Sequence, residues 1–215
     1  FASHVRADAR FAVALPDSLS SELAAPLLCA GITVFAPLQR QRLKPASRVG
    51  VVGLGGLGHL AVQFAAAMGF AVTVFSTSAH KQEEAYGFGA DRFVESSAPG
   101  VLSAAAGRCD LILTTVPVDL PWAEYLNLLK PNGHLSIVGA SPGEVRVPAF
   151  ALIDGQKSVG GSAVGSNSAI AEMLQFAAAH KIAPRIERFA LKNVNDALAR
   201  LRQNQMRYRA VLVLD

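Results

Sequence analysis

The stretch Val49–Gly58, with the sequence VGVVGLGGLG, decides the fold of this chain. Its first part, Val49–Val52, is a continuous apolar run, as expected for a parallel strand buried on both faces. The rest, Gly53–Gly58, fits the pattern G-x-G-x-x-G and leads into a segment of small residues that is typical of a helix. In this strand–loop–helix context the glycines predict a phosphate-binding loop for a dinucleotide.

Each residue of this loop has an expected role. Gly53 permits the tight turn, Gly55 lets the backbone approach a pyrophosphate, and Gly58 allows the helix to pack closely on the strand. Gly56 and Leu57 open the helix, whose free N–H groups and partial positive charge favour phosphate. A glycine-rich turn in an unrelated α/β fold is the alternative interpretation.

Outward from the loop, apolar strand-like segments alternate with helical ones. The alternation is typical of βαβ units and predicts an α/β fold with a doubly wound parallel sheet, a Rossmann domain, over residues 31–161. We expect strands over residues 49–52, 72–75, 92–94, 111–114, 135–138 and 158–160, and helices over 56–68, 79–86 and 122–130.

The two ends of the chain differ from this alternation. Two short helical stretches are expected before residue 40, and the tail predicts a helix over 169–180, an extended piece over 185–189, a helix over 193–202 and a closing strand over 209–214. These segments exceed what one such sheet needs. We therefore expect residues 1–30 and 162–215 to pack outside the Rossmann domain.

The end of the second strand indicates which dinucleotide is bound. NAD-binding domains usually carry Asp or Glu there, about 20 residues beyond the glycines, to hold the ribose 2′-hydroxyl. This chain has Ser76, Thr77 and Ser78, followed by Lys81, and no carboxylate at the strand tip. Three hydroxyls and one ammonium suit a 2′-phosphate, which predicts NADP(H). The same hydroxyls are also suited to capping the following helix.

The composition bounds the class of protein. Of the 215 residues, 51% are hydrophobic and 17% charged, which allows a sizeable core and excludes a disordered chain. The net charge is +4 without a basic block, so we expect no nucleic-acid partner. No apolar run reaches the roughly 20 residues of a membrane span, so we expect no membrane partner. Two cysteines are too few for a disulfide scaffold and favour a reducing, cytoplasmic location.

Several motifs, in order along the chain, resemble a single family. They are Leu28–Thr33 (LCAGIT), the loop Gly53–Gly58, Ser76–Ser78 (STS), Gly160–Ser162 (GGS) and Arg207–Arg209 (RYR). Together they resemble the zinc-dependent medium-chain alcohol dehydrogenases, in particular the cinnamyl-alcohol-dehydrogenase-like branch. The resemblance implies that residues 1–30 and 162–215 are remnants of a second, catalytic domain at the two ends of the Rossmann domain. It also implies a homodimer joined through the last strand of that domain.

The resemblance further implies roles for single residues. Cys29 matches the last ligand of the catalytic zinc, and is thus the implied catalytic and metal-binding residue of this chain. Thr33 is implied as a contact near the nicotinamide end of the cofactor, and Arg209 as a partner of the pyrophosphate. Further contacts implied around the nicotinamide are Thr115, Val138, Gly139 and Ser162. An ordinary buried cysteine is the alternative for Cys29, and Cys109 is expected in the core.

The chain departs from this family in its metal ligands. A catalytic zinc needs three protein ligands, and the family takes the others from an N-terminal catalytic domain. Neither a Cys-x-x-Cys cluster nor a Gly-His-Glu triplet occurs here. The five histidines, His4, His59, His80, His134 and His180, are expected at the surface or at helix ends. His59, beside the loop, is a candidate to orient the helix N-terminus.

We therefore expect an NADP(H)-dependent alcohol dehydrogenase or aldehyde reductase that uses zinc in the full-length enzyme and takes a small alcohol or aldehyde as substrate. The chain alone is expected to bind the cofactor without turnover. Two alternatives stay open. One is a zinc-free quinone or enone reductase of the same superfamily, and the other is a non-enzymatic NADP(H)-binding module.

Overall fold

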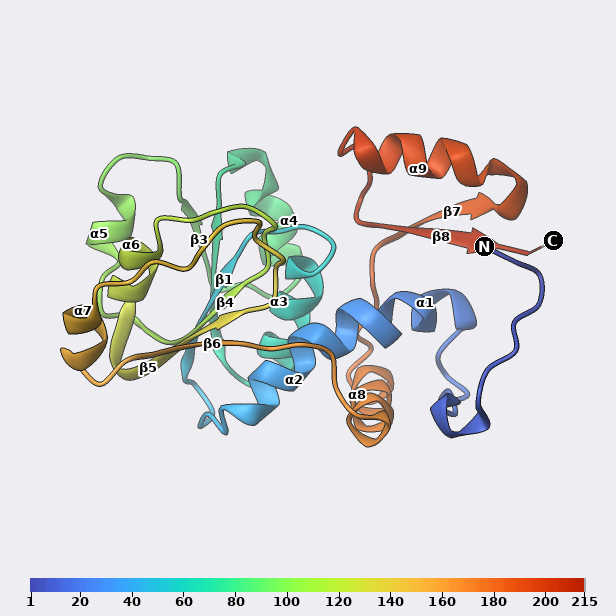
Figure 1. The fold of residues 1–215 in the computed structure, drawn as a ribbon, viewed down its shortest axis with the longest axis horizontal. Helices are drawn as coiled ribbons and strands as arrows, with labels where there is room; N and C mark the ends of the chain where they lie inside the picture. Colours follow the sequence, from blue (N-terminus) through green and yellow to red (C-terminus); the bar gives the residue numbers. More distant parts are fainter. Residues whose placement is uncertain (215) are drawn as a thin grey trace.

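A six-stranded parallel sheet forms the centre of the molecule, seen in a computed structural model that describes residues 1–214 (Figure 1). Its strands lie in the order β3-β2-β1-β4-β5-β6. They are β1 (Arg48–Val52), β2 (Ala71–Ser76), β3 (Arg92–Glu95), β4 (Cys109–Thr114), β5 (Leu129–Ile137) and β6 (Ser158–Gly161). This is the strand order of a dinucleotide-binding Rossmann domain, so the predicted doubly wound sheet is confirmed.

Helices cover both faces of this sheet. One hydrophobic cluster contains buried residues of α2 (Ile32–Arg40), α3 (Gly58–Ala67), α4 (Gln82–Gly87) and α8 (Asn167–Ala179). The other contains residues of α5 (Val101–Ala104) and α6 (Trp122–Asn127), with α7 (Ala149–Ile153) packed against it. Since both faces are buried, the strands read as apolar runs in the sequence.

Several elements differ from the sequence-based expectation. The helix expected over 122–130 ends at Asn127, because Leu129 already pairs with Cys109 at the start of β5. Helices α5 and α7 were not predicted, since four and five residues are too short to show a helical period.

The two short helices expected before residue 40 form one continuous helical stretch instead. Helix α1 (Ser21–Pro26) runs through a π-helical turn, η2 (Leu27–Gly31), directly into α2. The stretch Ser21–Arg40 is long and apolar enough to span a membrane by length and composition alone, which corrects the expectation that nothing reaches that length. However, 56% of its most apolar window is buried in the molecule, as in the core helix of a globular domain.

A smaller unit lies beside the Rossmann sheet. It consists of a two-stranded parallel sheet of β7 (Ile186–Ala190) and β8 (Arg209–Val213), connected by α9 (Val194–Arg202). Helix α1 contacts β8, and an ion pair of 2.7 Å between Arg188 and Glu22 joins β7 to α1. Figure 1 shows the N-terminal segment running alongside this unit. The division of the chain into residues 1–30, 31–161 and 162–215 stays a prediction.

Candidate cofactor site

The glycine loop has the geometry that its sequence predicts. Gly53 lies in the left-handed region, with a φ of +92°, as the tight turn requires. A Cβ at Gly58 would lie 2.0 Å from the carbonyl oxygen of Gly53, so the helix packs against the strand at a distance that only glycine allows. A Cβ at Gly55 would meet no atom within 4 Å, because the backbone there faces open space.

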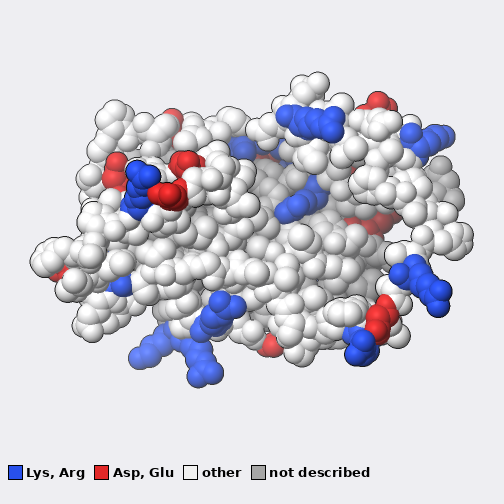
Figure 2. Space-filling view, viewed as in Figure 1, with Lys and Arg blue, Asp and Glu red and all other residues white. Residues whose placement is uncertain are grey.

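This open space is a continuous cleft at the carboxyl ends of the strands. Two adjoining cavities, of about 670 Å³ and 480 Å³, share Gly55, Gly56, Ser78, Lys81 and Thr115 among their lining residues. Successive strands are added outward from β1 to β3 on one side of this point and from β4 to β6 on the other, and such switch points are where open α/β sheets bind ligands. Figure 2 shows a hollow between the Rossmann half and the smaller unit, with basic side chains beside it.

The tip of β2 lines the cleft with hydroxyl groups. Ser76 is buried, and its Oγ accepts a hydrogen bond of 3.2 Å from the backbone N–H of Ser78. Ser78 precedes the next helical turn without a side-chain capping bond, so the capping interpretation is not seen. The Lys81 ammonium donates to the carbonyl oxygen of Leu54 over 2.8 Å, which holds it beside the loop. Among the described residues that line the two cavities, none is acidic.

Arg209, on β8, reaches the loop from the smaller unit. Its Nε donates to the carbonyl oxygen of Gly56 over 2.9 Å. A Cβ at Gly56 would lie 2.8 Å from that Nε, so glycine makes room for the guanidinium. Arg207, Tyr208 and Asn204 line the cleft from the same side. The sequence motif RYR drew attention to this segment, but no signal in the sequence singles out Asn204.

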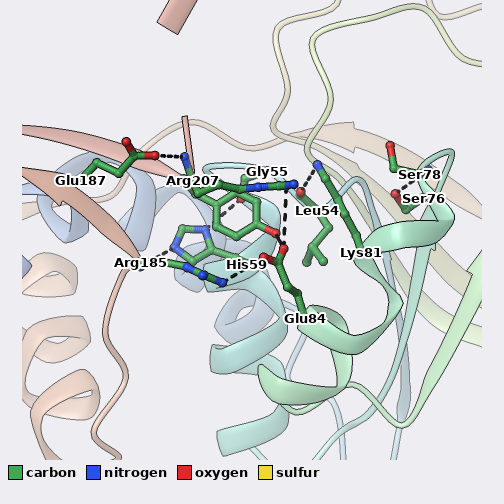
Figure 3. Close-up of polar contacts among 11 residues, drawn as sticks. Leu54, Gly55, His59, Ser76, Ser78, Lys81, Glu84, Arg185, Glu187 and Arg207 are labelled. Carbon is green, nitrogen blue, oxygen red and sulfur yellow. Dashed lines mark hydrogen bonds and ion pairs between the residues drawn. The ribbon is translucent and has the colours of Figure 1, made fainter. Parts of the chain in front are cut away.

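A polar cluster stands behind the loop, between α3, α4 and the smaller unit (Figure 3). Glu84 accepts a hydrogen bond from the Tyr208 hydroxyl and forms an ion pair of 2.9 Å with Arg185. Burial opposes ionisation of Glu84, yet the Tyr208 hydrogen bond and the positive charges of Arg207, Arg185 and Lys81 hold its pKa below the usual value. Burial, together with the Glu84 carboxylate, raises the pKa of Tyr208.

His59 is the buried centre of this cluster. It lies at the N-terminal end of α3, as expected, but it is fully buried rather than at the surface. One ring nitrogen, Nδ1, lies 2.9 Å from the carbonyl oxygen of Gly55, and Nε2 lies 3.1 Å from the backbone nitrogen of Arg185. Burial lowers its pKa to about 4, and the positive charges of Arg209 and Arg185 act in the same direction.

Cys29 stands in the π-helical turn η2, with an exposed side chain. The Thr33 hydroxyl donates to the Cys29 carbonyl oxygen over 2.7 Å, and π-turns of this kind are frequent at functional sites. Within residues 1–214, no group of three His, Cys, Asp or Glu side chains is placed to hold a metal ion. The residues present therefore supply one thiol and do not by themselves make a zinc site. Cys109 is buried in the core, where burial raises its pKa to about 11.

The structure brings most of the predicted cofactor residues together, but not all of them. Thr33, Val138 and Ser162 are absent from the described lining of the two cavities, and Gly58 is buried where it packs on Gly53. The predicted cofactor residues that do line the cleft are Gly53, Gly55, Gly56, Leu57, Ser76, Thr77, Ser78, Lys81, Thr115, Gly139 and Arg209.

A Rossmann sheet with this loop and cleft defines a dinucleotide-binding dehydrogenase domain. The chain belongs to the zinc-binding dehydrogenase family, whose profile matches residues 56–179. The resemblance to zinc-dependent medium-chain alcohol dehydrogenases of the cinnamyl-alcohol-dehydrogenase-like branch is thereby confirmed.

Individual relatives agree with this assignment. The chain is 43% identical to the aldehyde reductase AdhA of Synechocystis sp., over 99% of its own length and 63% of that protein. Among solved structures, a cinnamyl alcohol dehydrogenase from Sorghum bicolor matches 93% of this chain and 57% of its own, with 45% identity and a TM-score of 0.88. The cinnamyl alcohol dehydrogenase of Helicobacter pylori, complexed with NADP(H), is 33% identical over 94% of this chain and 57% of its own, with a TM-score of 0.81. The chain thus spans less than two thirds of these relatives.

Proposed function

We propose that this chain is the NADP(H)-binding part of an alcohol dehydrogenase or aldehyde reductase. The observation that carries the proposal is the cleft in front of Gly55, which is open to the loop backbone and has no acidic residue among its described lining. A ligand that carries phosphates fits such a site. The solved relative from Helicobacter pylori, whose structure contains NADP(H), supports the same cofactor.

The two ends of the cleft would hold different phosphates. The loop N–H groups and the N-terminus of α3 face the pyrophosphate, with Arg209 as its cationic partner. Ser76, Thr77 and Ser78 then surround the adenosine ribose, where the 2′-phosphate of NADP(H) would lie. Lys81 uses one of its three N–H donors on Leu54, so further donors are available for that phosphate.

Cofactor titration tests this proposal. We expect NADPH to bind at least about tenfold more tightly than NADH, because a charge-assisted phosphate contact contributes about 1.5–3 kcal/mol. Quenching or enhancement of the reduced nicotinamide fluorescence measures both affinities on the same protein. Equal affinities would remove the case for NADP(H), and absence of binding to either cofactor would remove the proposed function altogether.

Cys29 is proposed as one ligand of a catalytic zinc in the full-length enzyme. Zinc, when bound, supplies a Lewis acid for the oxygen of a small alcohol or aldehyde. The exposed thiol and its π-turn are suited to a metal, but the remaining ligands must come from outside the described residues. The exposed position also argues against the alternative of an ordinary core cysteine.

We further propose that the protein is a cytoplasmic homodimer. Strand β6 is an edge strand of the six-stranded sheet, and edge strands are normally covered or paired. Pairing of two β6 strands across a twofold axis would extend the sheet into the partner. Light scattering at high protein concentration is expected to give the mass of a dimer, and a monomer under these conditions would contradict the proposal.

A further inference from the structure

His59 is held by two hydrogen bonds that point in opposite directions. A neutral imidazole has one donor and one acceptor nitrogen. The carbonyl oxygen of Gly55 can only accept, so Nδ1 carries the hydrogen and donates over 2.9 Å. The backbone N–H of Arg185 then donates to Nε2 over 3.1 Å. The ring therefore joins the phosphate loop to the segment that leads into the smaller unit.

The contacts continue from Arg185 back to the loop. The carbonyl oxygen of Arg185 accepts from the backbone N–H of Arg209 over 3.2 Å, and also from that of Tyr208. The Arg209 side chain in turn donates to Gly56 over 2.9 Å. Gly55, His59, Arg185, Arg209 and Gly56 thus form a closed ring of contacts that begins and ends on adjacent residues of the loop.

Packing fixes the imidazole within this ring. The Tyr208 ring stacks on His59 with centroids 4.9 Å apart and planes 16° apart, and Phe88 meets His59 edge-on at 5.5 Å. Tyr208 is itself fixed by its hydrogen bond to Glu84. A side chain that is stacked on one ring, packed beside a second and bonded through both nitrogens has one orientation, so it transmits the position of the loop to Arg185.

From this geometry we propose that His59 is a positioning residue for the cofactor pyrophosphate, acting through Arg209. It does not line the described cleft, so its action on a cofactor is indirect. It sets the distance between the loop and the Arg185 backbone, and this distance places the Arg209 guanidinium over Gly56. The inference rests on the proposed function, because it assigns Arg209 to the pyrophosphate.

The substitution His59→Phe tests the proposal. Phe keeps an aromatic ring that can stack on Tyr208 but removes both hydrogen bonds. We expect NADPH to bind about ten- to a hundredfold more weakly, which is the range for a lost charge-assisted contact. NADH should weaken by the same factor, because both cofactors contain the pyrophosphate. His180→Phe is the matched control, since His180 is exposed and also stacks on an aromatic ring, that of Phe176; its affinities should not change.

A double-mutant cycle separates positioning from a merely structural role. Arg209→Met removes the guanidinium and should weaken both cofactors by at least as much as His59→Phe. If His59 acts through Arg209, then His59→Phe in the Arg209→Met background should weaken binding by less than about twofold. Additive losses would overturn the proposal, and so would a His59→Phe variant with unchanged affinity.

A milder variant protects the test against failure to fold. The amide of His59→Gln reaches Arg185 but no longer serves Gly55 at the same time, so an intermediate loss of affinity is expected. Thermal unfolding of each variant reports folding independently of the cofactor. If the unsubstituted protein binds NADPH and Arg209→Met weakens it while both His59 variants bind normally, only the inference about His59 fails. If the unsubstituted protein binds no dinucleotide, the proposed function fails instead.

Discussion

The phosphate loop and the turn that carries Cys29 are both short segments for which a binding role is proposed, yet they differ in completeness. The loop is held on every side: Gly58 against Gly53, Arg209 on Gly56, and His59 under Gly55. The Cys29 thiol is exposed, and within residues 1–214 no set of three metal-binding side chains surrounds it.

The difference teaches which half of the chemistry this chain contains. Dinucleotide binding relies on backbone N–H groups, a helix N-terminus and a few cations, and all of these are present and in contact. A catalytic zinc relies on three convergent protein side chains, and Cys29 is the one that we propose from this chain. We therefore expect the two functions to be separable by substitution, and the following predictions test that separation.

The largest effect is expected at Gly55. The backbone there faces open space that the pyrophosphate needs, so Gly55→Val should abolish measurable NADPH binding. Folding should be retained, because a Cβ at Gly55 meets no atom within 4 Å. Cofactor fluorescence and thermal unfolding measure the two properties. Normal NADPH binding by this variant would show that the loop is not the phosphate site.

Two other glycines serve as controls for this substitution. Gly87, in α4, also has open space at its Cβ position and ordinary backbone angles, so Gly87→Val should change neither binding nor folding much. Gly58→Ala should instead lower the unfolding temperature, because its Cβ would lie 2.0 Å from the Gly53 carbonyl oxygen. This pattern distinguishes a position facing ligand from one facing protein.

The second prediction concerns Cys29. In the full-length protein, Cys29→Ala should remove zinc and aldehyde reduction while leaving NADPH binding within about twofold, because the loop uses none of its atoms. The 215-residue chain alone should bind NADPH but hold no stoichiometric zinc and show no turnover. Metal analysis and an NADPH-oxidation assay on both proteins decide the matter.

Cys109→Ala is the matched control for the metal. This cysteine lies in the core, so its substitution should lower stability but not the zinc content. Full zinc and activity in Cys29→Ala would show that Cys29 is not a zinc ligand, whereas an active full-length protein without stoichiometric zinc would favour the zinc-free reductase. NADPH binding without any turnover in the full-length protein would favour a non-enzymatic module.

The fold and the loop could be predicted from sequence because both depend on local patterns. Apolar runs identify strands buried on both faces, and glycine spacing identifies a turn that excludes Cβ atoms. Short helices such as α5 and the joining of α1 to α2 escaped prediction. Four residues show no period, and a π-turn continues a helix without any signal in composition.

The cluster behind the loop could not be predicted in the same way. His59, Glu84, Arg185 and Tyr208 are far apart in sequence, and only the packing of the smaller unit on the Rossmann domain brings them together. His59 was identified as a candidate by its place beside the loop, but its partner Arg185 lies 126 positions later. Contacts of this range depend on tertiary structure, which no local pattern encodes.

The third prediction concerns pH. Folding lowers the pKa of His59 from 6.5 to about 4, so between these pH values the unfolded chain binds a proton that the folded chain does not. The free energy of unfolding should therefore fall as pH drops from 6.5 to 4, by about 3 kcal/mol from this group, and be unaffected by it above pH 7. Arg185, Arg209, Glu84 and Tyr208 face the ring, and the charges of the two arginines favour the neutral form.

Urea unfolding at pH 5 and pH 7.5 measures this effect. The difference between the two pH values should be smaller in His59→Phe than in the unsubstituted protein, because the other titrating groups are common to both. Identical pH dependence in the two proteins would show that His59 is not the buried neutral group described above.

The smallest effect is expected at Lys81, and it sharpens the comparison within the cofactor site itself. Lys81 is half-buried beside the β2 tip, at the end of the cleft where the 2′-phosphate would lie, and burial, reinforced by Arg207, lowers its pKa. Lys81→Gln should weaken NADPH about tenfold, at the lower end of the range for a charged hydrogen bond since water screens a half-exposed pair. NADH, which has no 2′-phosphate, should bind within about twofold of its normal affinity. Lys44→Gln is the matched control. Lys44 is exposed in the loop before β1, at the amino-terminal ends of the strands and away from the cleft, so screening by salt should leave both affinities unchanged. Equal weakening of NADPH and NADH by Lys81→Gln would mean that Lys81 supports the loop through Leu54 rather than choosing between the cofactors.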